Sequence, residues 1–251
     1  ARWGIEALAR LDGMFALAFF DSAQQTGFLA RDPLGIKPLL YAVAGGELAF
    51  ASELRALVHL GAWRKDVDAG TVVQHLVFGY IAAPATIYRA AWRLPPAHYL
   101  AFGPSGISEP RRYHEFSAGP ATQEDYESSR TRIRRLIGNA VARQRVSDVP
   151  VGAFLSGGLD SSIVVCHLAE ATPQPVHTFC VGYADSQSYD EREYARLVAD
   201  RFGTRHEEVV LGERDVLDAI PRVLDHMGEP VGDSSIVPTS LVSWAARQFV
   251  T

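Results

Sequence analysis

The sequence has few cysteines, no long apolar run and no excess of positive charge. Its 251 residues include only two cysteines, Cys166 and Cys180, which is too few for a disulfide framework and fits a reducing compartment. The longest apolar runs, such as Met14–Phe20, fall far short of the ~20 residues of a membrane-spanning helix. The formal net charge of −5 means that any anion site must be local. We therefore expect a cytoplasmic protein that contacts neither membranes nor nucleic acid.

An initiator methionine and a signal peptide are also missing. The sequence begins at Ala1 and passes directly to residues that predict a helix end and a strand. We expect the chain to be an internal piece of a longer protein. The composition, 47% hydrophobic and 21% charged, is ordinary for a globular protein, and the length allows two modest domains.

The first sixty residues predict a block rich in strands, and a less regular stretch follows. The continuous apolar run Gly13–Phe20 predicts a strand buried on both faces. Further strands are expected at Thr26–Arg31, Leu39–Val43 and Glu47–Ala51. Ser52 is placed to cap a helix over Glu53–Leu60, and Asp68 is placed to cap a short helix that ends at Phe78. Proline- and glycine-rich turns follow, and they put a domain boundary near 105–121.

From Thr122 onward, helices and strands alternate. A long helix is predicted by an apolar stripe of Ile133, Leu136, Ile137, Ala140 and Val141. Strands are expected at Val151–Leu155, Val176–Val181 and His206–Leu211. Helices are expected at Ser161–Glu170, Asp190–Phe202 and Arg214–Met227. This alternation predicts a parallel sheet that is covered on both faces.

One loop carries a chemical pattern, Ser156-Gly157-Gly158-Leu159-Asp160-Ser161-Ser162. It follows an expected strand and opens a helix, and ligands of parallel sheets bind beyond the carboxyl ends of the strands. The paired glycines let backbone N–H groups approach a ligand closely, and the helix N-terminus adds positive potential. The three serines add hydroxyl donors, and Asp160 suits a Mg²⁺ ion held against phosphates. The pattern favours a phosphate site over a glycine turn with a serine cap.

The loop is not one of the commoner phosphate-binding patterns. It lacks the lysine of a Walker loop and the spacing of G-x-G-x-x-G. It resembles the PP-loop of the ATP pyrophosphatases, which cleave ATP between the α and β phosphates. The flanking stretches Ser147–Leu155 and His177–Tyr183 are similar to those of glutamine-hydrolysing asparagine synthetases, as are Tyr189–Ala195 and Gly203–Glu207.

The resemblance implies which residues bind ligands. Contacts to ATP and pyrophosphate are expected from Leu155, Ser156, Gly157, Gly158, Asp160, Ser161, Ser162 and Val181. Asp160 is expected to hold Mg²⁺. The amino-acid acceptor is expected near Glu229, Asp233 and Ser234, in a stretch where family members differ. For Asp190 and Glu191 we prefer a charge pair at a helix N-terminus over a catalytic role.

The amino-terminal block independently resembles the later strands of class II glutamine amidotransferase domains, in Leu11–Asp21, Arg31–Leu39 and Phe50–Leu57. The resemblance implies an α/β protein with an α+β N-terminal part. Residues 1–112 are expected to form the C-terminal half of an N-terminal-nucleophile glutaminase with αββα layers. Residues 113–251 are expected to begin a parallel-sheet PP-loop domain of the adenine nucleotide α-hydrolase kind. Arg31 and Asp32 are interpreted as an ion-paired turn that supports the fold.

By this resemblance, the whole protein is a glutamine-dependent asparagine synthetase that uses ATP and Mg²⁺. It would convert aspartate to β-aspartyl-AMP and pyrophosphate and then amidate it with ammonia from glutamine. The family's glutaminase nucleophile is an N-terminal cysteine, whereas residue 1 here is Ala. Cys166 and Cys180 are interpreted as small apolar residues beside the loop. With no glutaminase catalytic residue present, and a second phosphate loop expected only after Thr251, we expect the chain alone to be inactive.

Three alternatives stay open. Relatives of the family amidate other carboxylates, closing β-lactam or peptide rings or modifying sugars and surface polymers. A nucleic-acid binder is the second, because one long predicted helix contains Arg130, Arg132, Arg134, Arg135, Arg143 and Arg145. Such runs are usually solvated faces. A non-catalytic scaffold remnant is the third, against which the intact loop argues. The histidines show no metal-binding spacing, and the oligomeric state, a homodimer included, is open.

Overall fold

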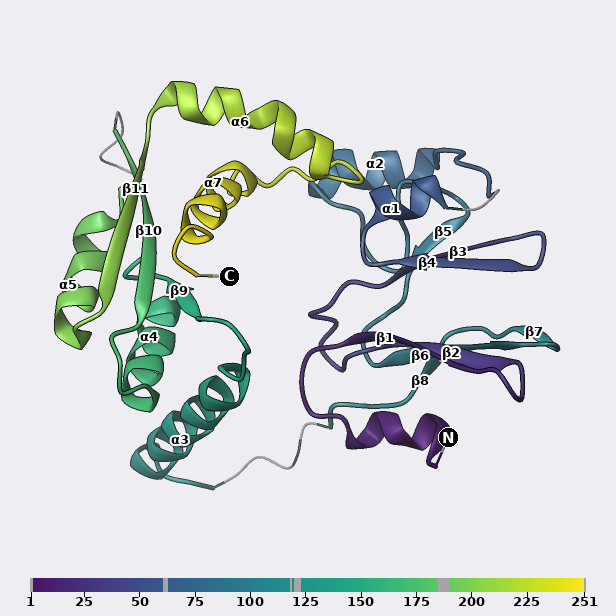
Figure 1. Cartoon of the computed structure of the whole chain (residues 1–251), viewed down its shortest axis with the longest axis horizontal. Helices are drawn as coiled ribbons and strands as arrows, with labels where there is room; N and C mark the ends of the chain where they lie inside the picture. The colour runs from purple at the N-terminus through teal and green to yellow at the C-terminus, as the bar shows by residue number, and fades with distance from the viewer. Residues whose placement is uncertain (1, 61–62, 118, 120–122, 185–189, 251) are drawn as a thin grey trace. The chain divides into compact units, whose positions relative to one another are not determined.

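The computed structural model describes residues 2–60, 63–117, 119, 123–184 and 190–250 (Figure 1). The protein is mixed α/β, and the chain divides into two compact units. Unit 1 consists of Ala1–Gly119 and Asp225–Asp233, and unit 2 consists of Pro120–Leu224 and Ser234–Thr251. The chain therefore passes from unit 2 back into unit 1 for nine residues before it returns.

Unit 1 contains two antiparallel sheets. The first joins β1 (Ala16–Asp21), β2 (Thr26–Arg31), β6 (His98–Gly103) and β7 (Gly106–Ile107), with β8 (Arg111–Arg112) paired to β6. The second joins β4 (Glu47–Ala51), β3 (Leu40–Ala44) and β5 (Ala91–Arg93). Gly45 and Gly46 form the turn between β3 and β4, and both have positive φ, as the predicted hairpin requires.

Three hydrophobic clusters arrange unit 1 in layers. One cluster fills the space between the two sheets and includes Leu29 of β2 and Tyr41 of β3. A second packs the 3₁₀ helix η1 (Gly4–Arg10) on the first sheet through Leu8. The third packs α1 (Leu54–His59) on the second sheet through Leu57. Unit 1 is thus layered as helix, sheet, sheet, helix, with α2 (Ala69–Phe78) beyond α1 in the sequence.

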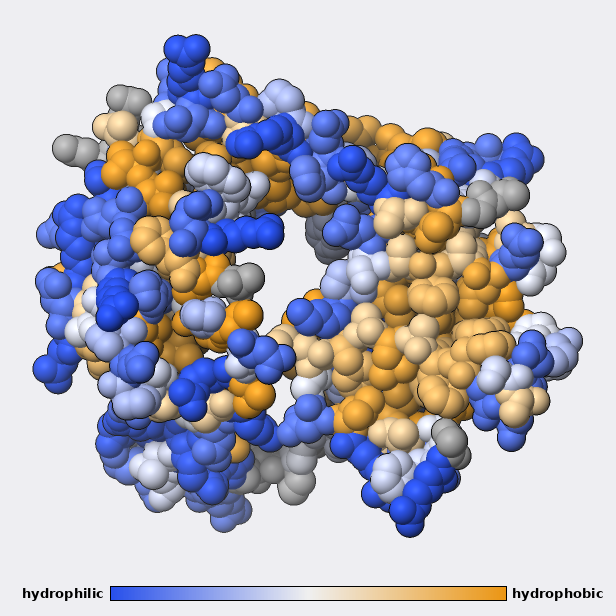
Figure 2. Space-filling model, in the orientation of Figure 1, coloured by the Kyte–Doolittle hydropathy of each residue, from blue (hydrophilic) through white to orange (hydrophobic). Residues whose placement is uncertain are grey.

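Two expectations for unit 1 are wrong in detail. β1 is not buried on both faces, because Phe20 is 54% exposed and only part of the strand contributes to the clusters. An apolar run alone cannot tell a central strand from one with an open face. The N-cap of α1 is Glu53 rather than Ser52, and no side chain caps it. Figure 2 shows hydrophobic residues gathered over the sheets of unit 1.

Unit 2 contains a parallel sheet in the order β11-β10-β9. Its strands are β9 (Gly152–Phe154), β10 (His177–Tyr183) and β11 (Arg205–Leu211). Its helices are α3 (Tyr126–Gln144), α4 (Leu159–Ala171), α5 (Arg192–Phe202), α6 (Glu213–His226) and α7 (Ile236–Ala246), and the last two residues of α6 fall in unit 1. The alternation of strands and helices predicted from the sequence is confirmed.

The central strand β10 uses its two faces differently. Cys180 packs against α4 and α5 through Val165, Ala195 and Ala199. Its neighbour Phe179 packs against α7. Figure 1 shows α5 and α7 on opposite sides of the strands. The alternation places helices on both faces of the sheet, because successive side chains of a strand point in opposite directions.

The long helix α3 buries less of its apolar stripe than the spacing predicts. Ile133 and Leu136 are 55% and 51% exposed, and none of the residues of α3 is fully buried. Its arginines lie against carboxylates: Arg130 with Glu127, Arg132 with Glu124 and Arg134 with Glu170. These are surface pairs, as expected for a solvated face. Within the described ranges, none of the helices combines the length and apolar character that crossing a membrane requires.

Candidate functional site

The loop Ser156–Ser162, hereafter the serine-glycine loop, lies at the carboxyl end of β9 and opens α4. Gly157 has φ of +77°, which only glycine adopts readily. A Cβ atom at Gly157 would lie 2.5 Å from the Cβ of Tyr194 and 2.6 Å from the backbone nitrogen of Ala195. Glycine is therefore required at this position both for the turn and for the close approach of α5.

Hydroxyl groups hold the loop in shape. The Ser156 and Ser161 hydroxyl oxygens are 3.1 Å apart, and the backbone N–H of Ser156 donates to Oγ of Ser161 at 3.3 Å. The Gly158 carbonyl accepts hydrogen bonds from the hydroxyls of Ser161 and Ser162, at 3.2 and 2.7 Å. The serine side chains thus pre-organise the turn. Each hydroxyl has a single O–H donor, so those of Ser161 and Ser162 must turn away from the Gly158 carbonyl before they can donate to an anion.

The first turn of α4 leaves polar groups available beside the loop. Gly158 is the N-cap residue and has no side chain that could cap the helix. The N–H groups of a first turn have no intrahelical acceptor, so they favour an anion at the loop. Asp160 lies in this turn and is exposed, and among the described residues no hydrogen bond or ion pair engages its carboxylate. A single free carboxylate next to phosphate oxygens is the kind of oxygen donor set that Mg²⁺ takes up.

A cavity of about 470 Å³ opens from the loop over the carboxyl ends of β9 and β10. Leu155 and Ser156 line it at β9, and Val181 and Tyr183 line it at β10. Further lining residues come from α7 and the stretch before it, namely Ser234, Ser235, Pro238, Thr239 and Val242. The structure therefore brings the predicted Leu155, Ser156 and Val181 to one cavity.

Sequence reasoning missed two parts of this cavity. Glu191 lines the cavity. The adjacent Asp190 instead forms an ion pair with Arg192 at 2.6 Å. The lining residues of α7 were also missed. No motif marks this helix, and its place at the cavity depends on how it packs against Phe179. Only the position of Glu191, shortly after the β10 strand end, gave a signal in the sequence.

The two cysteines lie beside the loop rather than in it. Cys180 is buried in β10, and burial first, with the nearby carboxylate of Glu191 second, raises the pKa of its thiol to about 11. Cys166 is on α4, and burial followed by the charge of Glu170 also raises its pKa. A raised pKa keeps both groups as thiols at neutral pH, so neither is an activated nucleophile.

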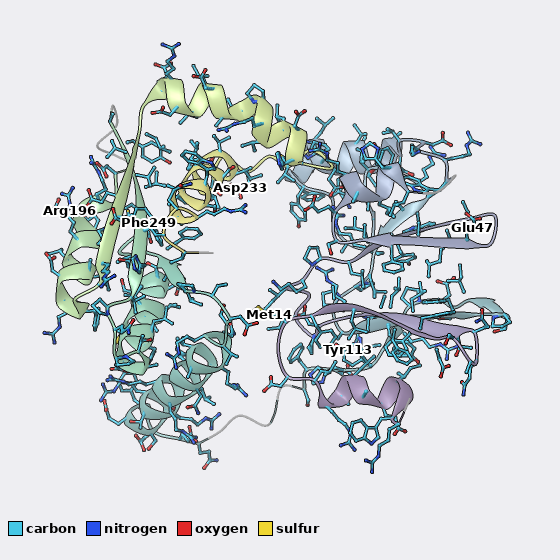
Figure 3. All side chains as sticks on the ribbon, in the orientation of Figure 1. Met14, Glu47, Tyr113, Arg196, Asp233 and Phe249 are labelled. Carbon is cyan, nitrogen blue, oxygen red and sulfur yellow. The ribbon has the colours of Figure 1, made fainter. Side chains whose placement is uncertain are left out.

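The three predicted acceptor residues do not all belong to the same unit. Glu229 and Asp233 belong to unit 1, and Ser234 belongs to unit 2. The Glu229 carboxylate forms an ion pair with Arg93 and accepts a hydrogen bond from the N–H of Ile87 at 3.1 Å. Figure 3 shows Asp233 on the stretch that leads into α7. Of the three, only Ser234 lines the cavity.

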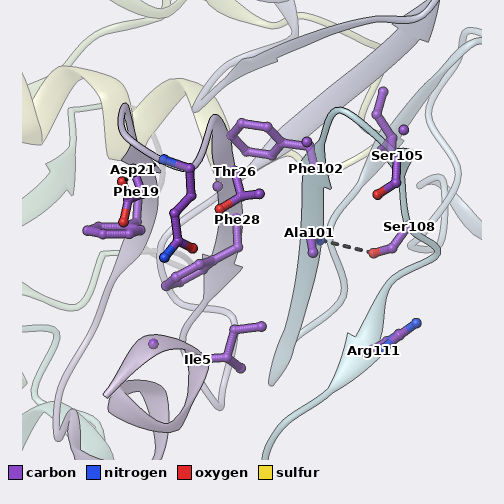
Figure 4. A pocket seen from close by; sticks show the side chains of 16 residues that line it. Ile5, Phe19, Asp21, Thr26, Phe28, Ala101, Phe102, Ser105, Ser108 and Arg111 are labelled. Carbon is purple, nitrogen blue, oxygen red and sulfur yellow. Dashed lines mark hydrogen bonds between the residues drawn. The ribbon is translucent and has the colours of Figure 1, made fainter. Parts of the chain in front are cut away.

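A larger cavity, of about 550 Å³, lies in unit 1 outside the first sheet (Figure 4). Its lining includes Phe19, Asp21, Phe102 and Arg111, and none of the predicted site residues. The Asp21 carboxylate is used within its own turn, where it accepts from the N–H groups of Ala23 and Gln24. The smaller cavity is the better candidate, because it lies at the carboxyl ends of parallel strands and is lined by predicted site residues.

The turn Arg31–Lys37, hereafter the aspartate turn, has a structural role. The Asp32 carboxylate accepts from the N–H groups of Leu34, Ile36 and Lys37 at 2.9–3.1 Å. Burial raises the pKa of Asp32, but these amides outweigh it and the net pKa lies below the ordinary value. Arg31 donates to the carbonyls of Lys37 and Leu94, each at 2.8 Å. Both side chains support the fold as predicted, through backbone hydrogen bonds in place of the expected mutual ion pair.

No resident metal cluster is formed by the side chains of the described residues: no three His, Cys, Asp or Glu come together as a group that could hold an ion. A Mg²⁺ ion that binds with ATP needs few protein ligands, because the phosphates and water complete its octahedral shell. Asp160 alone therefore fits such an ion at the serine-glycine loop.

Comparison with known proteins agrees with the order of the two units. Residues 1–114 match the glutamine amidotransferase domain family, and residues 132–251 match the asparagine synthase family. The matched arrangement is an amidotransferase domain followed by a synthase domain. The chain belongs to the asparagine synthetase family.

Several curated relatives cover nearly the whole chain. A putative glutamine-hydrolyzing asparagine synthetase of Methanocaldococcus jannaschii is 35% identical over 253 residues, covering 99% of this chain and 48% of the relative. A putative glutamine-hydrolyzing asparagine synthetase of Mycobacterium tuberculosis H37Rv is 33% identical over 254 residues, covering 99% and 39%. Asparagine synthetase 3 of Bacillus subtilis is 31% identical over 264 residues, covering 98% and 42%. The chain thus spans less than half the length of these relatives.

Proposed function

We propose that unit 2 binds ATP with Mg²⁺ at the serine-glycine loop and is the adenylating part of a glutamine-dependent asparagine synthetase. One observation carries the proposal. The loop lies at the carboxyl end of β9, it opens α4, and it borders a cavity of about 470 Å³. Ligands of parallel sheets bind at this edge, and a volume in this range suits a nucleotide-sized ligand.

The polar groups of the loop suit the phosphates. In the proposal, the hydroxyls of Ser156, Ser161 and Ser162 turn from their contacts within the loop and donate to the phosphates. The backbone at Gly157 and Gly158 approaches the phosphates closely. Leu155 and Val181 lie beside the nucleoside along the floor of the cavity. Asp160 holds a Mg²⁺ ion, which would neutralise charge on the phosphates. The exposed and unengaged carboxylate of Asp160 supports this assignment.

The proposed reaction has two steps. The β-carboxylate of aspartate attacks the α-phosphorus of ATP; an acyl C–O–P linkage forms, the bond to the β-phosphate breaks, and pyrophosphate leaves. Ammonia from glutamine then attacks the acyl carbon, giving asparagine and AMP. The protein contributes position and charge stabilisation, which the loop hydroxyls and first-turn amides of α4 provide for the departing pyrophosphate.

We propose the acceptor side and the fold families on resemblance. Glu229, Asp233 and Ser234 stay predicted acceptor residues, and the position of Ser234 in the cavity wall supports it best. Residues 1–112 are proposed as part of an N-terminal-nucleophile glutaminase, for which the helix, sheet, sheet, helix layering is support. Residues 113–251 are proposed as part of a PP-loop domain. Because both cysteines carry raised pKa values, we propose that the chain alone does not hydrolyse glutamine.

The proposal is tested by nucleotide binding and by product formation. Titration calorimetry of the 251-residue chain with ATP should show binding that requires Mg²⁺, and an affinity below detection would contradict the site. In the longer protein that contains this chain, pyrophosphate release should depend on aspartate and vanish in Asp160→Ala. Release elicited by another carboxylate, and not by aspartate, would identify a related amide-forming enzyme. Steady ammonia release from glutamine by the 251-residue chain would contradict its proposed inactivity.

A further inference from the structure

Within unit 2, the first turn of α5 lies against the serine-glycine loop. A Cβ atom at Gly157 would lie 2.6 Å from the backbone nitrogen of Ala195, so the two backbones approach each other as closely as a glycine allows. The N–H of Ala195 donates to the Glu191 carbonyl at 3.0 Å, which closes this turn of the helix. Whatever fixes the start of α5 therefore also limits where the loop can lie.

An ion pair between Asp190 and Arg192 holds the start of α5. The Arg192 Nε lies 2.9 and 3.0 Å from the two carboxylate oxygens of Asp190, and Nη2 lies 2.6 Å from Oδ2. The same carboxylate accepts the backbone N–H of Arg192 at 3.1 Å. Asp190 thus caps the helix in place of the N-cap residue Glu191, whose side chain makes no capping hydrogen bond. The side chains of the pair are 18% and 24% exposed, so solvent screens it less than it screens the surface pairs of α3.

The Arg192 side chain also holds α5 on the parallel sheet. It lies across the backbone of β10 at Gly182, where any Cβ atom would collide with its Nε and Cδ. Its Nη1 is 4.0 Å from the Glu208 carboxylate of β11. Arg196, one turn further along α5, donates two hydrogen bonds to the same carboxylate. The first two turns of α5 are therefore tied to β10 and β11 through Arg192 and Arg196.

Arg192 acts on the cavity from outside it. Glu191 lines the cavity of about 470 Å³, whereas Arg192 is not one of the described residues that line it. The Arg192 guanidinium faces Asp190 and Glu208 instead. The pKa of Asp190 lies below its ordinary value, chiefly because Arg192 donates to it, so the pair is ionised at neutral pH. We therefore expect any influence of Arg192 on a bound nucleotide to pass through α5 and the loop.

We propose that Arg192 is a positioning residue for the serine-glycine loop. By pairing with Asp190 and lying on Gly182, it holds the first turn of α5 against Gly157, and so it keeps the loop in the shape that binds phosphate. This inference rests on the proposed function where it concerns ATP, whereas the order of the loop can be measured without a nucleotide. All of these residues belong to unit 2.

Hydrogen–deuterium exchange on the nucleotide-free chain tests the positioning. Three amides report on the loop, because those of Ser156, Gly158 and Ser162 each donate a hydrogen bond within it. Arg192→Ala should speed their exchange by about tenfold, since protection falls where a segment loses its support. Arg192→Lys should keep part of the protection, because lysine retains the charge without the planar fork.

The matched control is Arg201→Ala, which removes an exposed arginine from the last turn of the same helix. It should leave exchange in the loop unchanged. Faster exchange of Ala195 with unchanged exchange in the loop would show that Arg192 stabilises α5 alone, and the proposal would be wrong. An equal rise throughout unit 2, with α3 included, would also overturn it, because the variant would then have lost stability in general.

Titration with Mg-ATP connects the order of the loop to binding. Arg192→Ala should weaken Mg-ATP binding by about tenfold, with a smaller loss in Arg192→Lys and none in Arg201→Ala. Asp190→Asn should have a similar effect. The double variant Asp190→Asn, Arg192→Ala should bind no more weakly than Arg192→Ala alone, because both changes remove one ion pair. Losses that add in the double variant would contradict a role through this pair.

The two measurements together separate the remaining explanations. Weaker Mg-ATP binding with unchanged exchange in the loop would make Arg192 a contact of the nucleotide, and the positioning role would be wrong. Faster exchange in the loop with unchanged Mg-ATP binding would show that this order does not serve the nucleotide, which also overturns the proposal. If the wild-type chain binds no Mg-ATP, the proposed function fails, and the exchange experiment still decides whether Arg192 orders the loop.

Discussion

Two turns of this protein contain an aspartate at a loop that follows a strand, and they treat it in opposite ways. In the aspartate turn, Asp32 is 1% exposed and its carboxylate accepts three backbone amides. In the serine-glycine loop, Asp160 is exposed, and among the described residues its carboxylate has no hydrogen-bond partner. A buried and saturated carboxylate has no capacity left for a ligand, whereas an exposed one beside free amides does. The contrast assigns Asp32 to the scaffold and makes Asp160 a candidate for ligand binding.

The largest expected effect is on the scaffold side of this comparison. Asp32→Ala leaves the amides of Leu34, Ile36 and Lys37 without their acceptor, and each buried unsatisfied donor costs ~1–3 kcal/mol. We expect unit 1 to lose about 3 kcal/mol or more of unfolding free energy. Urea unfolding followed by tryptophan fluorescence measures it, since three of the four tryptophans, Trp3, Trp63 and Trp92, belong to unit 1. A loss below about 1 kcal/mol would show that water replaces the carboxylate.

A pair of glycine variants tests the geometry of the serine-glycine loop. Gly157→Ala places a Cβ against Tyr194 and forces φ of +77° on alanine, for an expected cost of about 2 kcal/mol. Mg-ATP binding should be lost with the loop geometry. Gly158→Ala is the control, because its φ is −67° and its Cβ would meet only the Ser156 hydroxyl, at 3.3 Å. Equal stability of the two variants, by thermal unfolding, would contradict the geometry of the loop.

Asp160→Ala should separate binding from stability. We expect the Mg²⁺-dependent part of ATP affinity to fall about tenfold, or 1.4 kcal/mol. The unfolding free energy should stay within ~0.5 kcal/mol of wild type, as for most surface substitutions. Calorimetric titration with and without Mg²⁺ provides the readout, and Asp148→Ala, at another exposed aspartate of unit 2, is the matched control. A destabilised Asp160→Ala would place Asp160 with the scaffold.

The smallest expected effect is the dependence of the unfolding free energy on pH in acid. The pKa of Asp32 is lowered in the folded protein, so its stabilising contribution is complete above the ordinary pKa of about 3.9 and is lost as the pH falls below it. The wild-type chain should lose stability in this range faster than Asp32→Asn, which has no proton to take up. Unfolding free energies measured between pH 5 and about pH 3 test the difference. Parallel pH profiles would show that Asp32 is not stabilised as a carboxylate.

Local patterns predicted much of the structure. The Asp68 carboxylate caps α2 by accepting from Gly70 and Thr71, as its place before the helix indicated. The strands Thr26–Arg31 and Glu47–Ala51 begin and end at the predicted residues. The serine-glycine loop lies between a strand and a helix as expected. These features depend on neighbours within a few residues, which a sequence displays directly.

Features that depend on distant partners could not be predicted in this way. The exposure of Phe20 and of Ile133 depends on what packs against β1 and α3, and periodicity does not report that. The engagement of Glu229 depends on Arg93, which is more than a hundred residues earlier in the chain. The predicted limits 1–112 and 113–251 divide the chain once, and they give no sign that Asp225–Asp233 groups with Ala1–Gly119.

The segment Asp225–Asp233 constrains how this protein could be cut or recombined. The chain passes between the units at three points, so a cut near residue 119 would separate them only if residues 225–233 came away from unit 1 as well. A piece that begins after the linker would instead carry nine residues shaped for a surface it no longer has, and would leave Arg93 with a missing counter-ion. Exchange of the two halves between homologues should therefore succeed only when Glu229 and Arg93 travel together.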